Sequence, residues 1–79
     1  MNNNDTIERN EVDLLWVMAE LALITGEDIT RHKAVKFLEQ NEIVPKPKRF
    51  KQRVKYSHKL VQNALLRMRL ELINIEAEN

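Results

Sequence analysis

The chain has 79 residues, no cysteine and a net charge of +1. At this length we expect one domain over residues 10–79, preceded by a flexible tail at 1–9. Because the chain has no cysteine, it can form neither a disulfide nor a metal site with thiolate ligands. The polar N-terminus does not resemble a secretory signal, and the longest apolar run, 14–24, is shorter than the roughly 20 residues that cross a bilayer. We therefore expect a cytoplasmic protein outside the membrane.

A first helix is predicted over residues 10–25, where apolar residues recur at helical spacing. Gly26 is the only glycine of the chain and follows at the position of a helix C-cap. The helix carries two apolar stripes, so it should be buried on both sides or meet a partner. One stripe comprises Val12, Leu15, Trp16, Ala19, Ala22 and Leu23, and the other Leu14, Val17, Met18, Leu21 and Ile24.

A second helix is predicted over residues 31–41, with Thr30 or Asp28 as its N-cap. Its two long sides differ in chemistry, which makes it amphipathic. The inward side comprises Ala34, Phe37, Leu38 and Asn41, and the outward side Arg31, His32, Lys33, Lys36 and Gln40. A basic, hydrogen-bonding helix face of this kind suits the major groove of DNA.

The segment after this helix is predicted to be extended. Pro45 and Pro47 exclude a continuing helix. Val54 and Tyr56 then alternate with basic residues, which is the pattern of a short strand. Phe50 and Val54 are also four residues apart, as in a helix, but the strand is the favoured interpretation.

Charge is distributed unevenly along the chain. Residues 1–45 carry nine acidic and four basic side chains, whereas residues 46–79 carry nine basic and three acidic ones. Seven of these bases lie in residues 46–59, with no acidic residue among them. Such asymmetry indicates a polyanionic partner.

A last helix is predicted over residues 58–75, with Ser57 as its cap. Its main apolar stripe steps by four and three residues, which is close to a heptad repeat. The stripe comprises Val61, Leu65, Met68, Leu72 and Ile75, and it is widened by Leu66, Leu70 and Ile73. Only part of this surface is needed to close a small core, so we predict a homodimer, or a side-by-side assembly, through residues 58–75.

Residues 30–61 resemble the excisionase and MerR-type winged-helix family. That family has a capped recognition helix, a turn with two prolines, a basic hairpin wing that ends in an aromatic residue, and a further helix. The matching residues are Thr30, Ala34, Phe37 and Leu38 in the helix, Ile43, Pro45 and Pro47 in the turn, Arg53, Val54 and Tyr56 in the wing, and Val61 in the next helix. The resemblance implies a mainly α winged helix-turn-helix fold with three helices and a small β-hairpin wing. The glycine that usually turns the wing tip is missing. The long coiled coil and effector domain of larger members are also missing, which implies a minimal module that senses no ligand.

The same resemblance implies sequence-specific binding of double-stranded DNA. The role would be that of a phage or mobile-element excisionase (a recombination directionality factor) or of a small transcription regulator. An integrase or RNA polymerase would then be a further partner. The candidate DNA-binding residues are Arg31, His32, Lys33, Lys36, Gln40, Lys46, Lys48, Arg49, Lys51, Arg53 and Lys55.

An alternative resemblance lies in residues 34–43 and the helical stretch after them. These residues are similar to small late-transcription coactivators of large tailed phages. Those coactivators are helical and bind host RNA polymerase rather than DNA. On this alternative, the apolar stripe of the first or last helix would contact the polymerase.

Catalysis is not expected from this sequence. Ser57 is the only serine, and no glycine-rich turn or placed histidine–acid pair accompanies it as nucleophilic catalysis would require. His32 and His58 lie far apart and are expected at the surface or near a helix cap. We therefore predict a protein that is not an enzyme and that uses neither a metal nor a cofactor.

Overall fold

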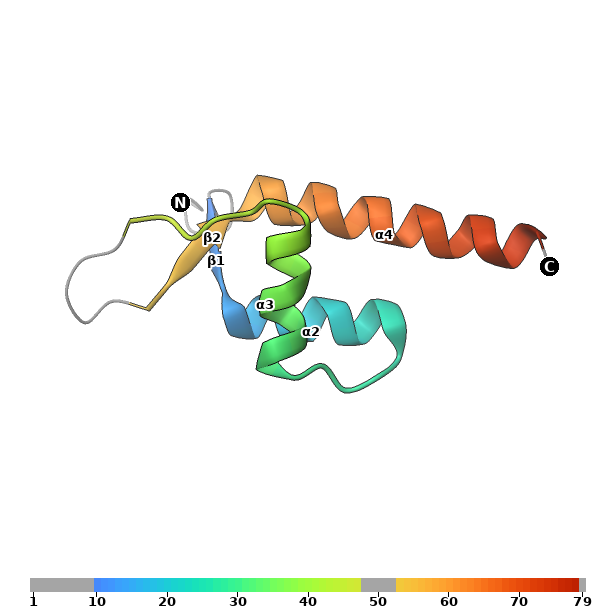
Figure 1. Ribbon diagram of the computed structural model, residues 1–79, viewed down its shortest axis with the longest axis horizontal. Helices are drawn as coiled ribbons and strands as arrows, with labels where there is room; N and C mark the ends of the chain where they lie inside the picture. Colours follow the sequence, from blue (N-terminus) through green and yellow to red (C-terminus); the bar gives the residue numbers. More distant parts are fainter. Residues whose placement is uncertain (1–9, 48–52, 79) are drawn as a thin grey trace, which may run out of the picture.

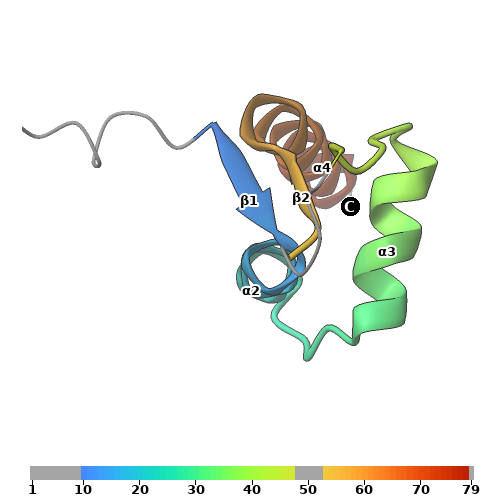
Figure 2. The same ribbon diagram turned by 90° about the vertical axis from the view of Figure 1, so that its left-hand side faces the viewer.

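Within residues 10–47 and 53–78, three helices and a small antiparallel sheet make up the fold (Figures 1 and 2). The computed structural model describes residues 10–47 and 53–78, with side chains through residue 74. The elements in chain order are strand β1 (Glu11–Asp13), helix α2 (Leu14–Thr25), helix α3 (Arg31–Gln40), strand β2 (Lys55–Ser57) and helix α4 (His58–Glu78). The predicted tail at 1–9 lies outside the described residues.

The helix ends follow from the capping residues. The Thr30 hydroxyl accepts a hydrogen bond from the backbone N–H of Lys33 at 3.1 Å, so Thr30, and not Asp28, caps α3. The Ser57 hydroxyl accepts one from the backbone N–H of Leu60 at 3.3 Å and caps α4. Gly26 ends α2 with a left-handed φ of 75°, which a residue without a Cβ adopts at little cost. These ends confirm the predicted caps.

Residues 10–13 are not helical, in contrast to the prediction. Val12 pairs with Tyr56 across the antiparallel sheet of β1 and β2, and both side chains are buried. Asp13 accepts a hydrogen bond from the backbone N–H of Trp16 at 3.0 Å, so α2 begins only after it. Val12 thus belongs to the core through a strand rather than through a helix.

The strand predicted near Tyr56 is confirmed, and its sheet partner is β1. Residues 43–47 run out beside β2 before the chain returns to it (Figure 1). There the backbone N–H of Lys46 donates to the carbonyl oxygen of Lys55 at 2.8 Å. We call residues 43–47 and 53–55 the wing base. Within the described residues, three helices and this small sheet give the predicted fold class and a winged-helix-like arrangement, but β2 pairs with β1 and not with a hairpin strand of the wing as predicted.

One hydrophobic core joins the helices and the sheet. The second of the two predicted α2 stripes faces it, with Val17 and Leu21 buried, while Leu15 and Leu23 of the first stripe are 53% and 75% exposed. The buried core residues are Val12, Val17, Leu21, Ala34, Phe37, Leu38, Ile43, Tyr56, Val61, Ala64 and Leu65. The predicted inward side of α3 is therefore confirmed for Ala34, Phe37 and Leu38.

Helix α4 extends well past the core. Val61, Ala64 and Leu65 are buried and Met68 packs against the core, but Leu72, on the same side one turn later, is 39% exposed. Beyond it, α4 projects past α2 and α3 (Figure 1). Within residues 10–47 and 53–78, none of the helices has both the length and the apolar character of a bilayer crossing.

Candidate nucleic-acid interface

The outward side of α3 is polar and open to solvent. All five predicted contact residues of this helix, Arg31, His32, Lys33, Lys36 and Gln40, are exposed. Packing of Phe37 and Leu38 into the core fixes the rotation of the helix, which places His32 and Lys36 farthest from the core at helical spacing. The sequence therefore predicted correctly which side of α3 faces outward.

Glu39 was missed by the sequence analysis, although it lies on this outward side. It is exposed and follows Lys36 and His32 by three and seven residues, so the three share one face of α3. The spacing of three residues from Lys36 and seven from His32 could have placed Glu39 on this face from the sequence alone. A carboxylate at the centre of a basic face repels phosphate, and it is also able to accept a hydrogen bond from the amino group of cytosine.

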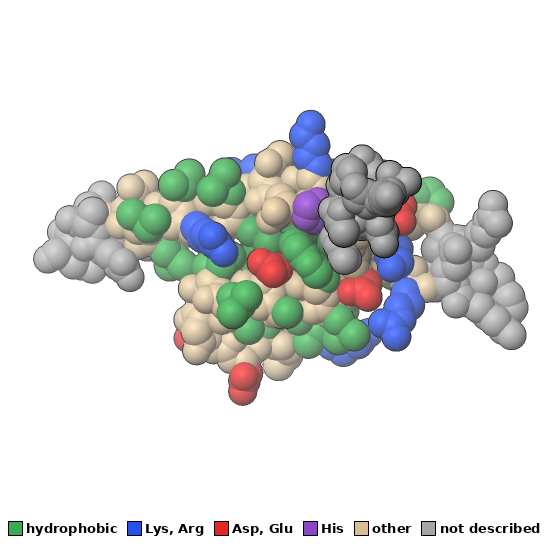
Figure 3. Space-filling view, turned by 180° about the vertical axis from the view of Figure 1, so that it is seen from behind, with side chains coloured by type: hydrophobic (Ala, Val, Ile, Leu, Met, Phe, Trp, Pro, Cys, Tyr) green, Lys and Arg blue, Asp and Glu red, His purple; other side chains and the backbone are tan. Residues whose placement is uncertain are grey.

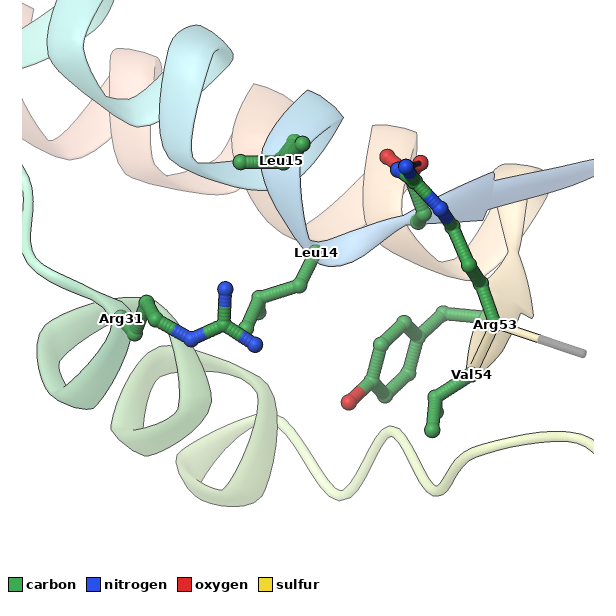
Figure 4. Close-up of a pocket in the computed structure, with 7 residues that line it drawn as sticks. Leu14, Leu15, Arg31, Arg53 and Val54 are labelled. Carbon is green, nitrogen blue, oxygen red and sulfur yellow. Dashed lines mark hydrogen bonds and ion pairs between the residues drawn. The ribbon is translucent and has the colours of Figure 1, made fainter. Parts of the chain in front are cut away.

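A cleft separates the start of α3 from the wing base (Figure 4). It has a volume of about 370 Å³ and is bordered by Arg31 on one side and by Arg53 and Val54 on the other. Leu14 and Tyr56 contribute apolar walls. In Figure 4, the Arg31 side chain extends beside Leu14, and Arg53 extends toward the start of α2. The cleft thus brings together two predicted contact residues that are 22 positions apart.

Two acidic residues of β1 form ion pairs with basic side chains of the wing base. An Arg53 Nη atom lies 3.5 Å from a carboxylate oxygen of Asp13, and Lys46 Nζ lies 3.7 Å from a carboxylate oxygen of Glu11. The Arg53 side chain is nevertheless 71% exposed. Exposed pairs of this kind contribute little to stability, so the bases can exchange a carboxylate for a phosphate at small cost.

Asp13 is the described residue with a clearly perturbed acidity. The hydrogen bond from the backbone N–H of Trp16 is the largest cause and lowers its pKa; burial opposes this effect, and the positive charges of Lys55 and Arg53 lower the pKa further. At neutral pH, Asp13 is therefore ionised, caps α2 and offers Arg53 a negative partner.

The basic side chains of α3 do not all face the wing base. Lys33, Lys36 and Gln40 border a second groove, whose floor includes Phe37 and Met68 and which lies on the side of α2 and α4. The predicted outward side therefore divides into a flank with Arg31 toward the wing and a flank with Lys33 and Gln40 toward α4. His32 and Lys36 lie between the two flanks.

The structure does not place every predicted site residue at the cleft. Lys48, Arg49 and Lys51 fall outside the described residues. Lys55 is half-buried on β2, and its backbone oxygen holds Lys46. The sequence could not show that Lys55 is half-buried, because its place on β2 depends on the pairing with β1 across more than 40 residues.

The remaining polar candidates have structural positions. The His58 ring packs edge-on against Trp16, with ring centroids 5.3 Å apart. Ser57 is occupied as the cap of α4. In the part of the chain that the structure describes, no group of three or more histidine, aspartate or glutamate side chains is placed to hold a metal ion.

Comparisons with known proteins identify no relative of this chain. No protein-family model, curated protein or solved structure gives a significant match to the chain.

Proposed function

We propose that this protein binds double-stranded DNA without catalysing a reaction. In this proposal, α3 enters the major groove with His32 and Lys36 toward the base edges, and the wing base lies over the adjacent backbone. The observation that carries it is the cleft between α3 and the wing base, because Arg31 and Arg53 border it from two different elements. An arginine on each side is suited to hold a phosphate backbone.

The basic run at 46–59 supports the same partner. Suppose that six to eight basic side chains of this run and of α3 neutralise phosphates. The logarithm of the binding constant should then fall with the logarithm of the salt concentration, with a slope of roughly −5 to −7. This electrostatic part of the binding does not depend on the DNA sequence. The side chains of α3 would add the discrimination between base pairs of the DNA.

The biological role that fits is that of a phage or mobile-element excisionase or of a small transcription regulator. This part of the proposal rests on the resemblance of residues 30–61 to excisionases and MerR-type proteins. Proteins of this type act by placing copies on DNA beside a recombinase or a polymerase.

Fluorescence anisotropy with a labelled random duplex of about 30 base pairs tests the proposal directly. We expect binding at about 50 mM salt and a large loss of affinity by about 200 mM. Absence of binding at low salt would overturn the proposal. The chain would then be tested for co-purification with RNA polymerase, as expected of a coactivator.

A matched pair of arginine variants locates the contact. Arg53→Ala should reduce the salt slope by about 1 unit. Arg69→Ala removes the same charge from α4, where Arg69 lies beside Glu20 and Leu66 and away from the cleft, and it should leave the slope unchanged. Equal slopes for both variants would remove the wing base from the interface.

A further inference from the structure

Helix α4 has a second apolar face that the core does not use. Leu66, Leu70 and Ile73 are 55%, 52% and 58% exposed. They lie roughly opposite the buried side chains of Val61 and Leu65, at spacings of four and three residues. Hydrophobic side chains gather along this helix in the space-filling view (Figure 3). A stripe at this spacing is the pattern of a seam between two helices.

The charges of α4 run opposite to the preference of a lone helix. Its first twelve residues include Lys59, Arg67 and Arg69 and no acidic residue, whereas the three acidic residues of the helix, Glu71, Glu76 and Glu78, all follow in its last turns. The helix dipole favours acidic residues near the N-terminus and basic residues near the C-terminus. An antiparallel neighbour of identical sequence removes this conflict, because it sets Arg67 and Arg69 of each copy beside the acidic end of the other.

We propose that a second copy of this chain packs antiparallel along the stripe of Leu66, Leu70 and Ile73. Leu70 of one copy then lies opposite Ile73 of the other, and a two-fold axis passes between them. The exposed side of α2 is a poorer choice for this partner. Its large residues are Leu15 and Leu23, and Glu20 is the one charged residue of that helix, so it offers no complementary charge.

This inference rests on α4 alone and does not depend on DNA binding. It narrows the predicted assembly through residues 58–75 to one face of α4, since Val61, Leu65 and Met68 pack into the core of their own chain. Combined with the proposed function, it places two α3 helices about a two-fold axis, which matches a DNA site with two inverted halves.

Sedimentation equilibrium at micromolar concentration tests the dimer. The wild-type chain should have twice the monomer mass of 9.4 kDa. Leu70→Glu should restore the monomer mass, because it places a charge at the centre of the pair, and circular dichroism should show unchanged helix content. Leu23→Glu, at the 75% exposed leucine of α2, is the matched control and should remain dimeric.

Two outcomes would overturn the proposal: a monomeric wild type at about 100 µM, a concentration at which a pair with a micromolar Kd is almost fully dimeric, or a dimer that survives Leu70→Glu. In either case, DNA binding by the wild type would still support the proposed function. The two proposals therefore fail separately.

A spin label at Lys59→Cys tests the orientation, since the chain has no other cysteine. Lys59 is exposed and precedes the stripe by two turns. In the antiparallel pair, the two labels should be about 35–40 Å apart, from 1.5 Å of rise per residue. A separation of about 10–15 Å would show a parallel pair and contradict the arrangement.

Discussion

Helices α3 and α4 present the same chemistry to the core and opposite chemistry to the outside. Phe37 and Leu38 of α3 are buried much as Val61 and Leu65 of α4 are. The outward face of α3 carries His32, Lys36 and Glu39, whereas the outward face of α4 carries Leu66, Leu70 and Ile73.

The difference indicates two kinds of partner on one small scaffold. A basic, hydrogen-bonding face is suited to a solvated polyanion, and an exposed leucine stripe is suited to another apolar helix. The shared core holds the two faces on separate helices, so each can be altered without the other. The following variants test this separation.

Phe37→Ala should have the largest effect, because it removes a large side chain from the shared core. We expect a loss of about 3–5 kcal/mol in the free energy of unfolding, enough to unfold a domain of this size. Urea denaturation followed by circular dichroism measures it. Lys36→Ala, the exposed neighbour on α3, should change the free energy by less than about 0.5 kcal/mol. A cooperative Phe37→Ala protein with a similarly small loss would show that the two sides of α3 are not distinct.

Two neighbouring leucines make the same comparison on α4. Leu65 is 3% exposed and Leu66 is 55% exposed. Leu65→Ala should cost about 2–5 kcal/mol as a core truncation. Leu66→Ala should cost less than about 1 kcal/mol when both are measured in the Leu70→Glu background, which removes the effect of pairing. Similar losses at the two positions would mean that α4 buries both faces within one chain.

The end of α3 offers a stabilising change. Glu42 has a left-handed φ of 58°, while its backbone N–H donates to the oxygen of Glu39 and that of Ile43 donates to the oxygen of Leu38. This is a Schellman ending, in which glycine is the preferred residue. Glu42→Gly should therefore raise the free energy of unfolding by up to about 1 kcal/mol, as measured by thermal melting. Glu39→Gly, inside the helix, should instead lower it by a similar amount.

Asp13→Asn tests the charge that borders the cleft of α3. Because the folded state lowers the pKa of Asp13, its ionised form contributes stability above the unfolded pKa, and this contribution is lost as pH falls through the folded pKa. Asparagine keeps the N-cap but does not titrate. The free energy of unfolding of the wild type should therefore exceed that of Asp13→Asn by a small amount at neutral pH. In denaturation experiments at a series of pH values, this difference should disappear between about pH 5 and pH 2. A difference that is constant over this range would remove Asp13 as its source.

Local signals in the sequence predicted much of this fold. Thr30, Ser57 and Gly26 each fix a helix end through hydrogen bonds or a backbone angle within a few residues of their own position. Phe37 and Leu38 were assigned to the core because a single amphipathic pattern runs through α3. For the same reason, the exposed side of the candidate interface was predicted correctly, apart from Glu39.

Features that depend on distant residues could not be predicted. Val12 fits both a helical stripe and a strand, and its partner Tyr56 is 44 residues away. The ion pairs of Lys46 and Arg53 with β1 depend on that same pairing. Helix α4 carries two stripes of similar spacing, and only packing against α2 and β2 decides that Leu65, and not Leu66, is buried.

A map of backbone amide shifts by NMR, recorded as duplex DNA is added, tests whether α3 and the wing base form the DNA contact. We expect large changes at Arg31, Lys36 and Arg53, with residues 66–73 of α4 almost unaffected. Changes concentrated along 66–73, with α3 unchanged, would contradict it. They would assign the DNA contact to α4 and leave the basic face of α3 to another partner.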